Sequence, residues 1–219
     1  MVRPKLHKKV FLYTTLSYNC STMKCLVIGD SHTRDLKQYF EFVRPGTDTF
    51  IVSKGSKTPE VIEQYRNNLY DISCFNPEVC YIHLGHNDMA QHPIYNPTPA
   101  YPKAIAAMTV DFAREVAINF PMSKVIISAT LPRTATSTSY MSDECTAKHN
   151  KNTKRHGQRL RHDARVYNIQ VALNNQFWLK ISKALEDSKM HDIDGLHLNA
   201  KGKVFLIRSW IGELDPVPT

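Results

Sequence analysis

Short apolar runs alternate with amphipathic stretches along most of the chain. The runs are four to eight residues long and show no apolar-polar alternation, so they predict strands that are buried on both faces. Each is followed by a stretch with helical periodicity, and this order predicts a parallel sheet covered by helices on both sides. The predicted strands lie at 25–28 and within 49–57, 78–88, 124–133 and 177–181.

Helices are predicted where apolar positions recur every three or four residues. The first begins near Thr33, and the next begins at Thr58, whose hydroxyl is expected to cap it ahead of Pro59. Further helices are predicted over 102–120, 156–175 and 200–210. The aligned apolar residues of the 156–175 helix are Leu160, Ala164, Tyr167 and Val171.

Polar residues gather where the predicted strands end. In a parallel sheet this is where binding sites form, outside the carboxyl ends of the strands. The first strand is followed by Asp30 and Ser31, and the second by Gly55. The third ends in Gly85, His86, Asn87 and Asp88, and a late loop carries Asp194 and His197.

These residues include a complete set for nucleophilic catalysis. His197 could take the proton of the Ser31 hydroxyl, and Asp194 could hold the imidazole in the required tautomer. An oxyanion would need donors, which the backbone N–H groups of Ser31 and Gly55 and the amide of Asn87 could supply. The alternative for Ser31 is simple capping of the following helix.

Four sequence blocks in this order resemble the SGNH hydrolase (GDSL-type esterase) superfamily, over roughly residues 22–213. The blocks are "GDSH" at 29–32, Gly55, "GHND" at 85–88 and "DGLH" at 194–197. The resemblance implies a flavodoxin-like three-layer α/β/α sandwich with a five-stranded parallel sheet. It also implies a triad of Ser31, Asp194 and His197, and an oxyanion hole of Ser31, Gly55 and Asn87. His32 stands where the superfamily more often has leucine.

Metal ligation is the alternative for the histidines near the third strand. His83, His86, Asp88 and His92 have suitable side chains. However, side chains alternate between the faces of a strand, so His83 and His86 are not expected to converge. The sequence therefore predicts neither a metal nor a cofactor. Asp194 could instead cap the last helix, but Asn199 is better placed for that role.

Composition favours one soluble domain. The chain has 219 residues, and we divide it into a basic N-terminal extension, residues 1–22, and a hydrolase domain, residues 23–219. No apolar stretch is long enough to span a membrane. The five cysteines are odd in number and form no C-x-x-C pair, which favours an intracellular, cytoplasmic location over secretion.

The net charge of +8 is concentrated in two segments. These are residues 1–24 and 148–165, and the second predicts either a solvated helix face or contact with a nucleic acid or another polyanion. "LPR" at 131–133 resembles esterase domains of non-LTR retrotransposon proteins. The sequence thus favours a serine esterase for small acyl or acetyl esters. The alternative is a non-catalytic binding module on the same scaffold, which would use this basic face.

Overall fold

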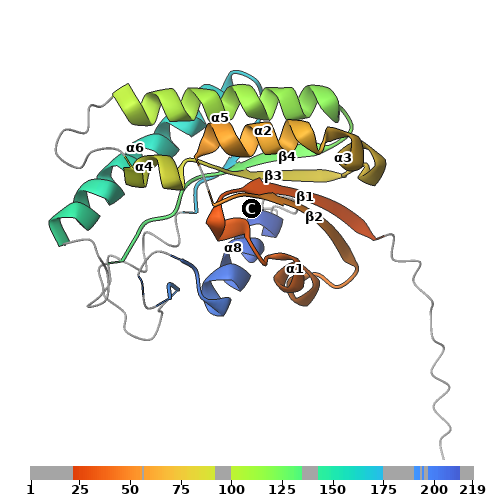
Figure 1. The fold of residues 1–219 in the computed structure, drawn as a ribbon, viewed down its shortest axis with the longest axis horizontal. Coiled ribbons are helices and arrows are strands. Elements are labelled where there is room, and N and C mark those ends of the chain that lie inside the picture. The colour runs from red at the N-terminus through yellow and green to blue at the C-terminus, as the bar shows by residue number, and fades with distance from the viewer. Residues whose placement is uncertain are drawn as a thin grey trace, which may run out of the picture.

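A computed structural model describes residues 22–55, 57–91, 100–134, 143–174, 190–192, 194 and 197–212. Its centre is a sheet of five parallel strands in the order β2-β1-β3-β4-β5 (Figure 1). The strands are β1 (Met23–Gly29), β2 (Thr47–Ser53), β3 (Val79–His83), β4 (Lys124–Ser128) and β5 (Gln170–Ala172). The predicted α/β class with a five-stranded parallel sheet is confirmed.

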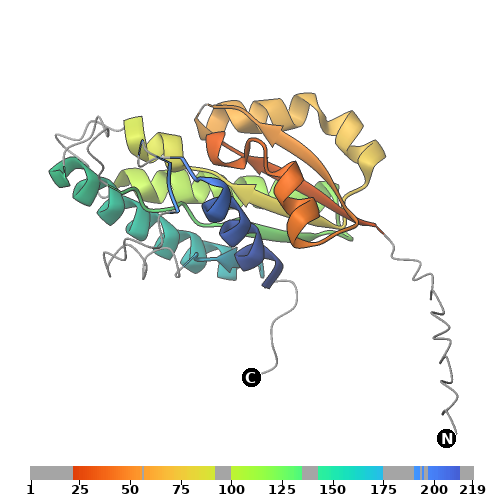
Figure 2. The same cartoon turned by 90° about the horizontal axis from the view of Figure 1, so that it is seen from below.

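Helices cover both faces of this sheet and complete three layers (Figures 1 and 2). One face packs against α1 (Lys37–Val43) and α8 (Ala200–Gly212). The other packs against α2 (Thr58–Asn67), α3 (Leu69–Phe75), α5 (Ala100–Asn119) and α6 (Asp143–Arg165). The short helix α4 (His86–Gln91) follows β3, and a 3₁₀ turn, η1 (Ser31–Thr33), follows β1.

Double coverage explains why the central strands are apolar without interruption. In β1, Leu26 and Ile28 belong to the core on the α2–α5 side, whereas Cys25 and Val27 belong to the core on the α1–α8 side. All four side chains are completely buried. Both sets of alternating side chains therefore leave water, and each contributes hydrophobic stabilisation.

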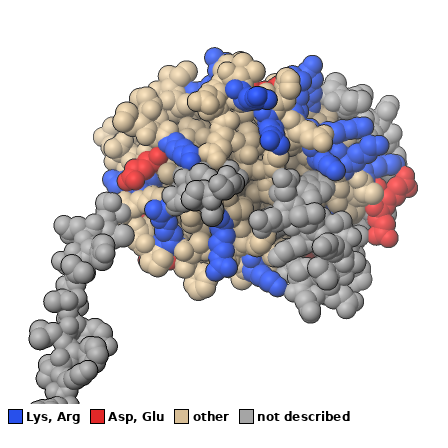
Figure 3. All heavy atoms as spheres, turned by 180° about the vertical axis from the view of Figure 1, so that it is seen from behind, with Lys and Arg blue, Asp and Glu red and all other residues tan. Residues whose placement is uncertain are grey.

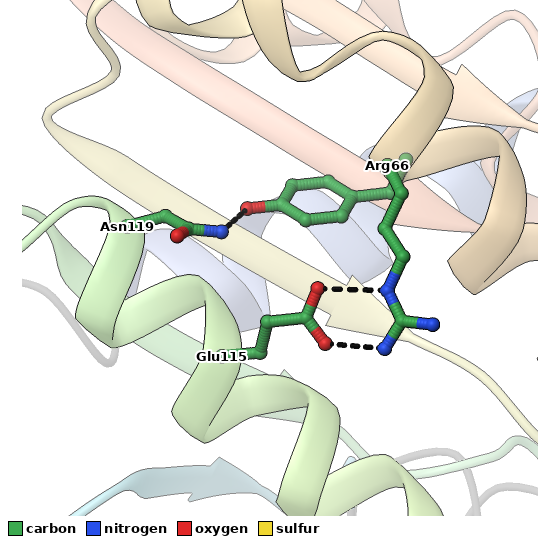
Figure 4. A network of polar contacts seen from close by, with 4 residues as sticks. Arg66, Glu115 and Asn119 are labelled. Carbon is green, nitrogen blue, oxygen red and sulfur yellow. Dashed lines mark hydrogen bonds and ion pairs between the residues drawn. The ribbon is translucent and has the colours of Figure 1, made fainter.

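Two kinds of contact join α2 to α5. Inside, the Tyr65 ring meets the Phe112 ring edge-to-face at 5.0 Å, and the Asn119 amide donates to the Tyr65 hydroxyl at 3.0 Å. At the surface, the Arg66 guanidinium binds both carboxylate oxygens of Glu115, at 2.9 and 2.6 Å (Figure 4). The apolar contact fixes the packing, because an exposed ion pair contributes little to stability.

The predicted helix at 156–175 is wrong at both ends, since α6 runs from Asp143 to Arg165. Its early half escaped prediction because polar residues fill its buried face. These residues are Thr146, His149, Thr153 and His156. Apolar periodicity cannot detect a helix that buries polar side chains.

The end of α6 is set by a turn that apolar spacing does not show. Asn168 adopts a left-handed conformation with φ 57°, and the Ile169 amide donates to the Ala164 carbonyl at 3.1 Å. This stops the helix, so Tyr167 lies outside it and is 44% exposed. Val171 belongs to β5, where it pairs with Ile127 of β4.

Further differences concern where predicted elements begin and end. The helix expected from Thr33 begins at Lys37, after the η1 turn. The fifth strand is β5, whereas the strand predicted at 177–181 lies outside the described residues, as does nearly all of the N-terminal extension.

None of the described helices combines the length and apolarity needed to cross a membrane.

Candidate active site

The register of the sheet places the sequence blocks side by side. Gly29, the last residue of β1, pairs with Ser53 at the end of β2 and with His83 at the end of β3. Ser31 and Gly55 each lie two residues beyond these paired positions. The blocks containing Ser31 and Gly55 therefore leave adjacent strands at the same edge of the sheet.

A glycine is required at position 29 because Thr33 and the His83 backbone approach the Gly29 backbone closely. A Cβ atom at this position would collide with the Thr33 side chain and with the backbone carbonyl of His83. The missing side chain allows the chain to turn directly from β1 into η1. The glycine of the "GDSH" block therefore has a steric explanation.

Hydrogen bonds around Asp30 hold the turn that presents Ser31. Asp30 Oδ1 accepts from the His32 amide at 3.1 Å. The Asp30 carbonyl accepts from the hydroxyls of Thr33, at 2.9 Å, and Ser53, at 2.8 Å. Ser31 is half-buried between the fully buried Asp30 and His32. The turn is therefore fixed from both β1 and β2 while the serine keeps some solvent access.

Asp30 also lies against the start of α4. Burial raises the pKa of its carboxyl group to about 7, and the charge of Asp88 acts in the same direction. Backbone N–H groups of His32, His86 and Asn87 oppose this rise. Because the N–H groups of His86 and Asn87 act on the Asp30 carboxyl group, the beginning of α4 lies next to the turn that carries Ser31.

The turn between β3 and α4 depends on Gly85. Its φ of 98° is left-handed, and a Cβ atom there would lie 3.0 Å from the His156 ring. The Gly85 carbonyl accepts from the Met89 amide at 3.0 Å. This turn places the half-buried Asn87 in the first turn of α4, at the same edge of the sheet as Ser31.

Asp88 connects α4 to the segment that carries Gly55. Its Oδ2 accepts from the Thr58 amide at 3.0 Å and from the Thr58 hydroxyl at 2.7 Å. Thr58 is thus the first residue of α2, bonded to Asp88, and the prediction that its hydroxyl caps the helix is wrong. Gly55 is exposed, and a Cβ atom there would lie 3.3 Å from a guanidinium nitrogen of Arg34.

Asp194 and His197 form a hydrogen-bonded pair. Nδ1 of His197 lies 2.7 Å from Asp194 Oδ2, and the His197 amide donates to Oδ1 at 2.9 Å. The Asp192 amide donates to the His197 carbonyl at 2.8 Å, and His191 pairs with Leu198. A proton held at Nδ1 leaves Nε2 as the acceptor, and the His197 side chain is 42% exposed.

The histidine loop lies beside the serine turn. The ring centroids of His32 and His197 are 5.8 Å apart, and His32 follows Ser31 directly in the chain. The structure therefore gathers the predicted residues at one edge of the sheet. Ser31 leads from β1, Gly55 from β2 and Asn87 from β3, and the Asp194–His197 pair lies next to η1.

Buried histidines surround this edge and were not predicted as a group. Each of the six has at most 8% of its surface exposed. They come from distant parts of the sequence, which is why no local motif indicates them. They are His32, His83, His86, His149, His156 and His191.

His83 and His86 both lie near the His32 ring, on either side of the turn after β3. The His32 ring lies 4.2 Å from the His86 ring and 5.8 Å from the His83 ring. The reason is that β3 ends at His83 and the left-handed Gly85 redirects the chain. His86 Nε2 accepts from Nε of the buried Arg133 at 3.1 Å, so its proton resides on Nδ1.

Burial keeps these imidazoles neutral. It lowers the pKa of His83 and His191 to about 4 and that of His149 and His156 to about 3. Burial and neighbouring histidines lower the pKa values of His32 and His86 well below the usual value of an imidazole. Among the described residues, no group of three or more His, Cys, Asp or Glu is arranged to hold a metal ion.

Solved structures share this architecture at low sequence identity. A protein described as a GDSL-like lipase from Parabacteroides merdae matches with a TM-score of 0.58 and 14% identity, over 87% of this chain and 94% of that one. The lipase/acylhydrolase from Enterococcus faecalis matches with a TM-score of 0.62 and 14% identity, over 90% of this chain and 100% of that one. A catalytic mutant of Axe2, an acetylxylan esterase from Geobacillus stearothermophilus, matches with a TM-score of 0.58 and 16% identity. The match covers 89% of this chain and 94% of that one.

No protein-family model and no curated protein matches the sequence. The likeness therefore shows the fold, and the order of the four blocks agrees with it. The chain has the α/β fold of these solved structures, which are described as a GDSL-like lipase, a lipase/acylhydrolase and an acetylxylan esterase.

Proposed function

We propose that the protein is a serine ester hydrolase in which Ser31 is the nucleophile. The observation that carries the proposal is the Asp194–His197 hydrogen bond of 2.7 Å, in a loop whose histidine ring lies against His32, next to Ser31. A carboxylate at Nδ1 orients a histidine for proton transfer at Nε2. The fold is shared with lipases and esterases, which agrees with this chemistry.

The reaction begins when Ser31 Oγ attacks the carbonyl carbon of the ester and its proton passes to His197 Nε2. The negative charge that develops on the carbonyl oxygen is held by the backbone N–H groups of Ser31 and Gly55 and by the Asn87 amide. Asp194 stabilises the imidazolium. When the carbon–oxygen bond to the alcohol breaks, His197 returns the proton to the leaving alcohol.

An acyl-enzyme on Ser31 remains. Water, deprotonated by His197, attacks its carbonyl carbon, and Ser31 leaves with a proton from the same imidazole. This sequence requires no metal and no cofactor. We propose small acyl esters, in particular acetyl esters, as substrates, because acetylxylan esterases are among the proteins of the same fold.

The test is hydrolysis of p-nitrophenyl acetate by wild-type protein and two serine variants. Ser31→Ala should lower turnover by about 10⁴-fold or more. Ser73→Ala is the matched control, because Ser73 is exposed on α3, just before the amino end of β3, and should keep wild-type turnover. Wild-type turnover in a folded Ser31→Ala protein would contradict the proposal and favour a non-catalytic module.

A further inference from the structure

Helix α6 carries far more positive than negative charge. It has seven Lys and Arg residues against three Asp and Glu residues. Two of those acids are paired within the helix, Glu144 with Lys148 at 2.6 Å and Asp163 with Arg159 at 2.7 Å. The remaining cations are therefore not neutralised by the helix itself.

Five exposed cations of α6 form one surface, which we call the α6 basic stripe. At 100° per residue, they fall within a sector of about 120°, and they span about 21 Å along the helix axis. None of them takes part in an ion pair found among the described residues. The stripe consists of Lys151, Lys154, Arg155, Arg161 and Arg165.

Packing fixes the direction in which the stripe faces. Leu160 and Ala164 are completely buried in the core, and the His156 ring meets the Thr130 hydroxyl at 3.2 Å. The helix cannot rotate without exposing these groups, so its cations stay on the outside. Seen from behind, this face of the molecule carries many Lys and Arg side chains and few acidic ones (Figure 3).

The composition of the stripe selects its partner. Its exposed neighbours on the helix, Gln158 and His162, are polar, and no large apolar side chain lies between the cations. A membrane-binding helix would insert apolar residues into the lipid, and the stripe has none. Cations repeated along one helix face are instead suited to a chain of phosphates.

We propose that the α6 basic stripe binds the phosphate backbone of single-stranded nucleic acid. Binding is independent of base sequence, since the contacts are charges on long flexible side chains. It does not depend on the proposed esterase chemistry, because Ser31 lies after β1 and not on α6. Five engaged phosphates predict that log Kd changes with log salt with a slope of about 3.5 in magnitude.

The experiment measures fluorescence anisotropy of a labelled 20-nucleotide oligo(dT) with the full chain between 50 and 200 mM salt. The test variant carries Lys151→Glu, Lys154→Glu and Arg155→Glu. These positions avoid the last turn of α6, where acids would oppose the helix dipole. A second variant with Gln at the same positions removes charge without adding repulsion.

The control variant has the same change in net charge. Lys37→Glu, Lys103→Glu and Arg208→Glu alter exposed residues of α1, α5 and α8. We expect wild type, Ser31→Ala and the control to bind with similar salt slopes. The Glu variant should bind at least 10-fold more weakly, and the Gln variant should lose about 2 from the magnitude of the slope.

Three outcomes would overturn the proposal. The first is no binding of oligo(dT) by wild type at 50 mM salt. The second is equal loss of binding in the control, or full binding in both stripe variants, which would place the contact elsewhere on the chain. The third is binding to phosphatidylserine vesicles but not to oligo(dT), which would identify a membrane as the partner. Circular dichroism of every variant confirms that α6 is still folded.

Discussion

Two regions of the molecule are equally buried but are built differently. Between the sheet and its helices, the core consists of apolar side chains such as Leu26 and Ile28 of β1. At the carboxyl edge of the sheet, the buried groups are imidazoles, the Asp30 carboxyl and the Arg133 guanidinium. The first region stabilises the fold, whereas the second holds polar groups in place at a cost in stability. We therefore expect the polar region to make stability depend on pH and the apolar region not to do so.

The largest expected effect is loss of stability in acid. An unfolded histidine has a pKa near 6.5, whereas burial holds the pKa of four of these histidines at about 3 to 4 and also lowers the pKa values of His32 and His86. Above pH 6.5 these histidines are mainly neutral in both the folded and the unfolded protein. Below it the unfolded chain takes up protons that the folded protein does not, so stability falls by about 1.4 kcal/mol per pH unit for each histidine.

Asp30 acts in the opposite direction. Its folded pKa of about 7 lies above the unfolded value of 3.8, so it contributes stability at low pH and loses it as pH rises through 7. Its contribution to the pH dependence of stability offsets that of only one of the six buried histidines. Urea unfolding should therefore show a drop of several kcal/mol between pH 6.5 and 5. A free energy of unfolding that stays constant over this range would contradict the neutral histidine cluster.

The next effect concerns the apolar region. Phe112→Ala removes a buried ring that packs edge-to-face on Tyr65, and should lower the free energy of unfolding by about 3–5 kcal/mol. The loss should be the same at pH 7 and at pH 6, because no titrating group is involved. Turnover per folded molecule at 25 °C should be unchanged. A strong fall in turnover would mean that the two regions are not independent.

Asn87→Ala should affect turnover rather than stability. The side chain is half-buried at the start of α4, and we assign its amide to the developing oxyanion. Removing one such donor lowers turnover by about 10²–10³-fold, with a smaller change in KM. Steady-state kinetics with p-nitrophenyl acetate distinguishes the two parameters. A change confined to KM would assign Asn87 to ground-state binding.

The smallest effect is expected at the surface. The Arg66–Glu115 pair has good bidentate geometry, but the Arg66 side chain is 59% exposed (Figure 4). A double-mutant cycle with Arg66→Ala and Glu115→Ala should give a coupling energy below about 1 kcal/mol, decreasing with salt. A coupling of 3 kcal/mol would make this pair comparable to a core contact.

The same contrast explains what the sequence could predict. The apolar region follows simple periodicity, so the strand at 25–28 and the helix at 200–210 are confirmed within β1 and α8. The capping role of Asn199 is confirmed as well, since its Oδ1 accepts from the Gly202 amide at 3.0 Å. Local signals were sufficient in these segments.

The polar region could not be predicted in the same way. The first half of α6 buries His149 and Thr153, which apolar periodicity treats as surface residues. His32, His83 and His149 come from η1, β3 and α6, and only the folded sheet brings them together. The blocks containing Ser31, Gly55 and Asn87 could be located from the sequence because they follow β1, β2 and β3, whose ends the parallel register places side by side.

The most direct test of the account is covalent labelling of Ser31. Diisopropyl fluorophosphate forms a bond between an activated serine oxygen and phosphorus with loss of fluoride, and needs no knowledge of the natural substrate. Trypsin should release residues 25–34, a peptide in which Ser31 is the single serine. We predict one adduct, on this peptide, that is lost in Ser31→Ala and strongly reduced in His197→Ala. An unlabelled peptide in the folded wild type, or labelling that persists in Ser31→Ala, would contradict the account.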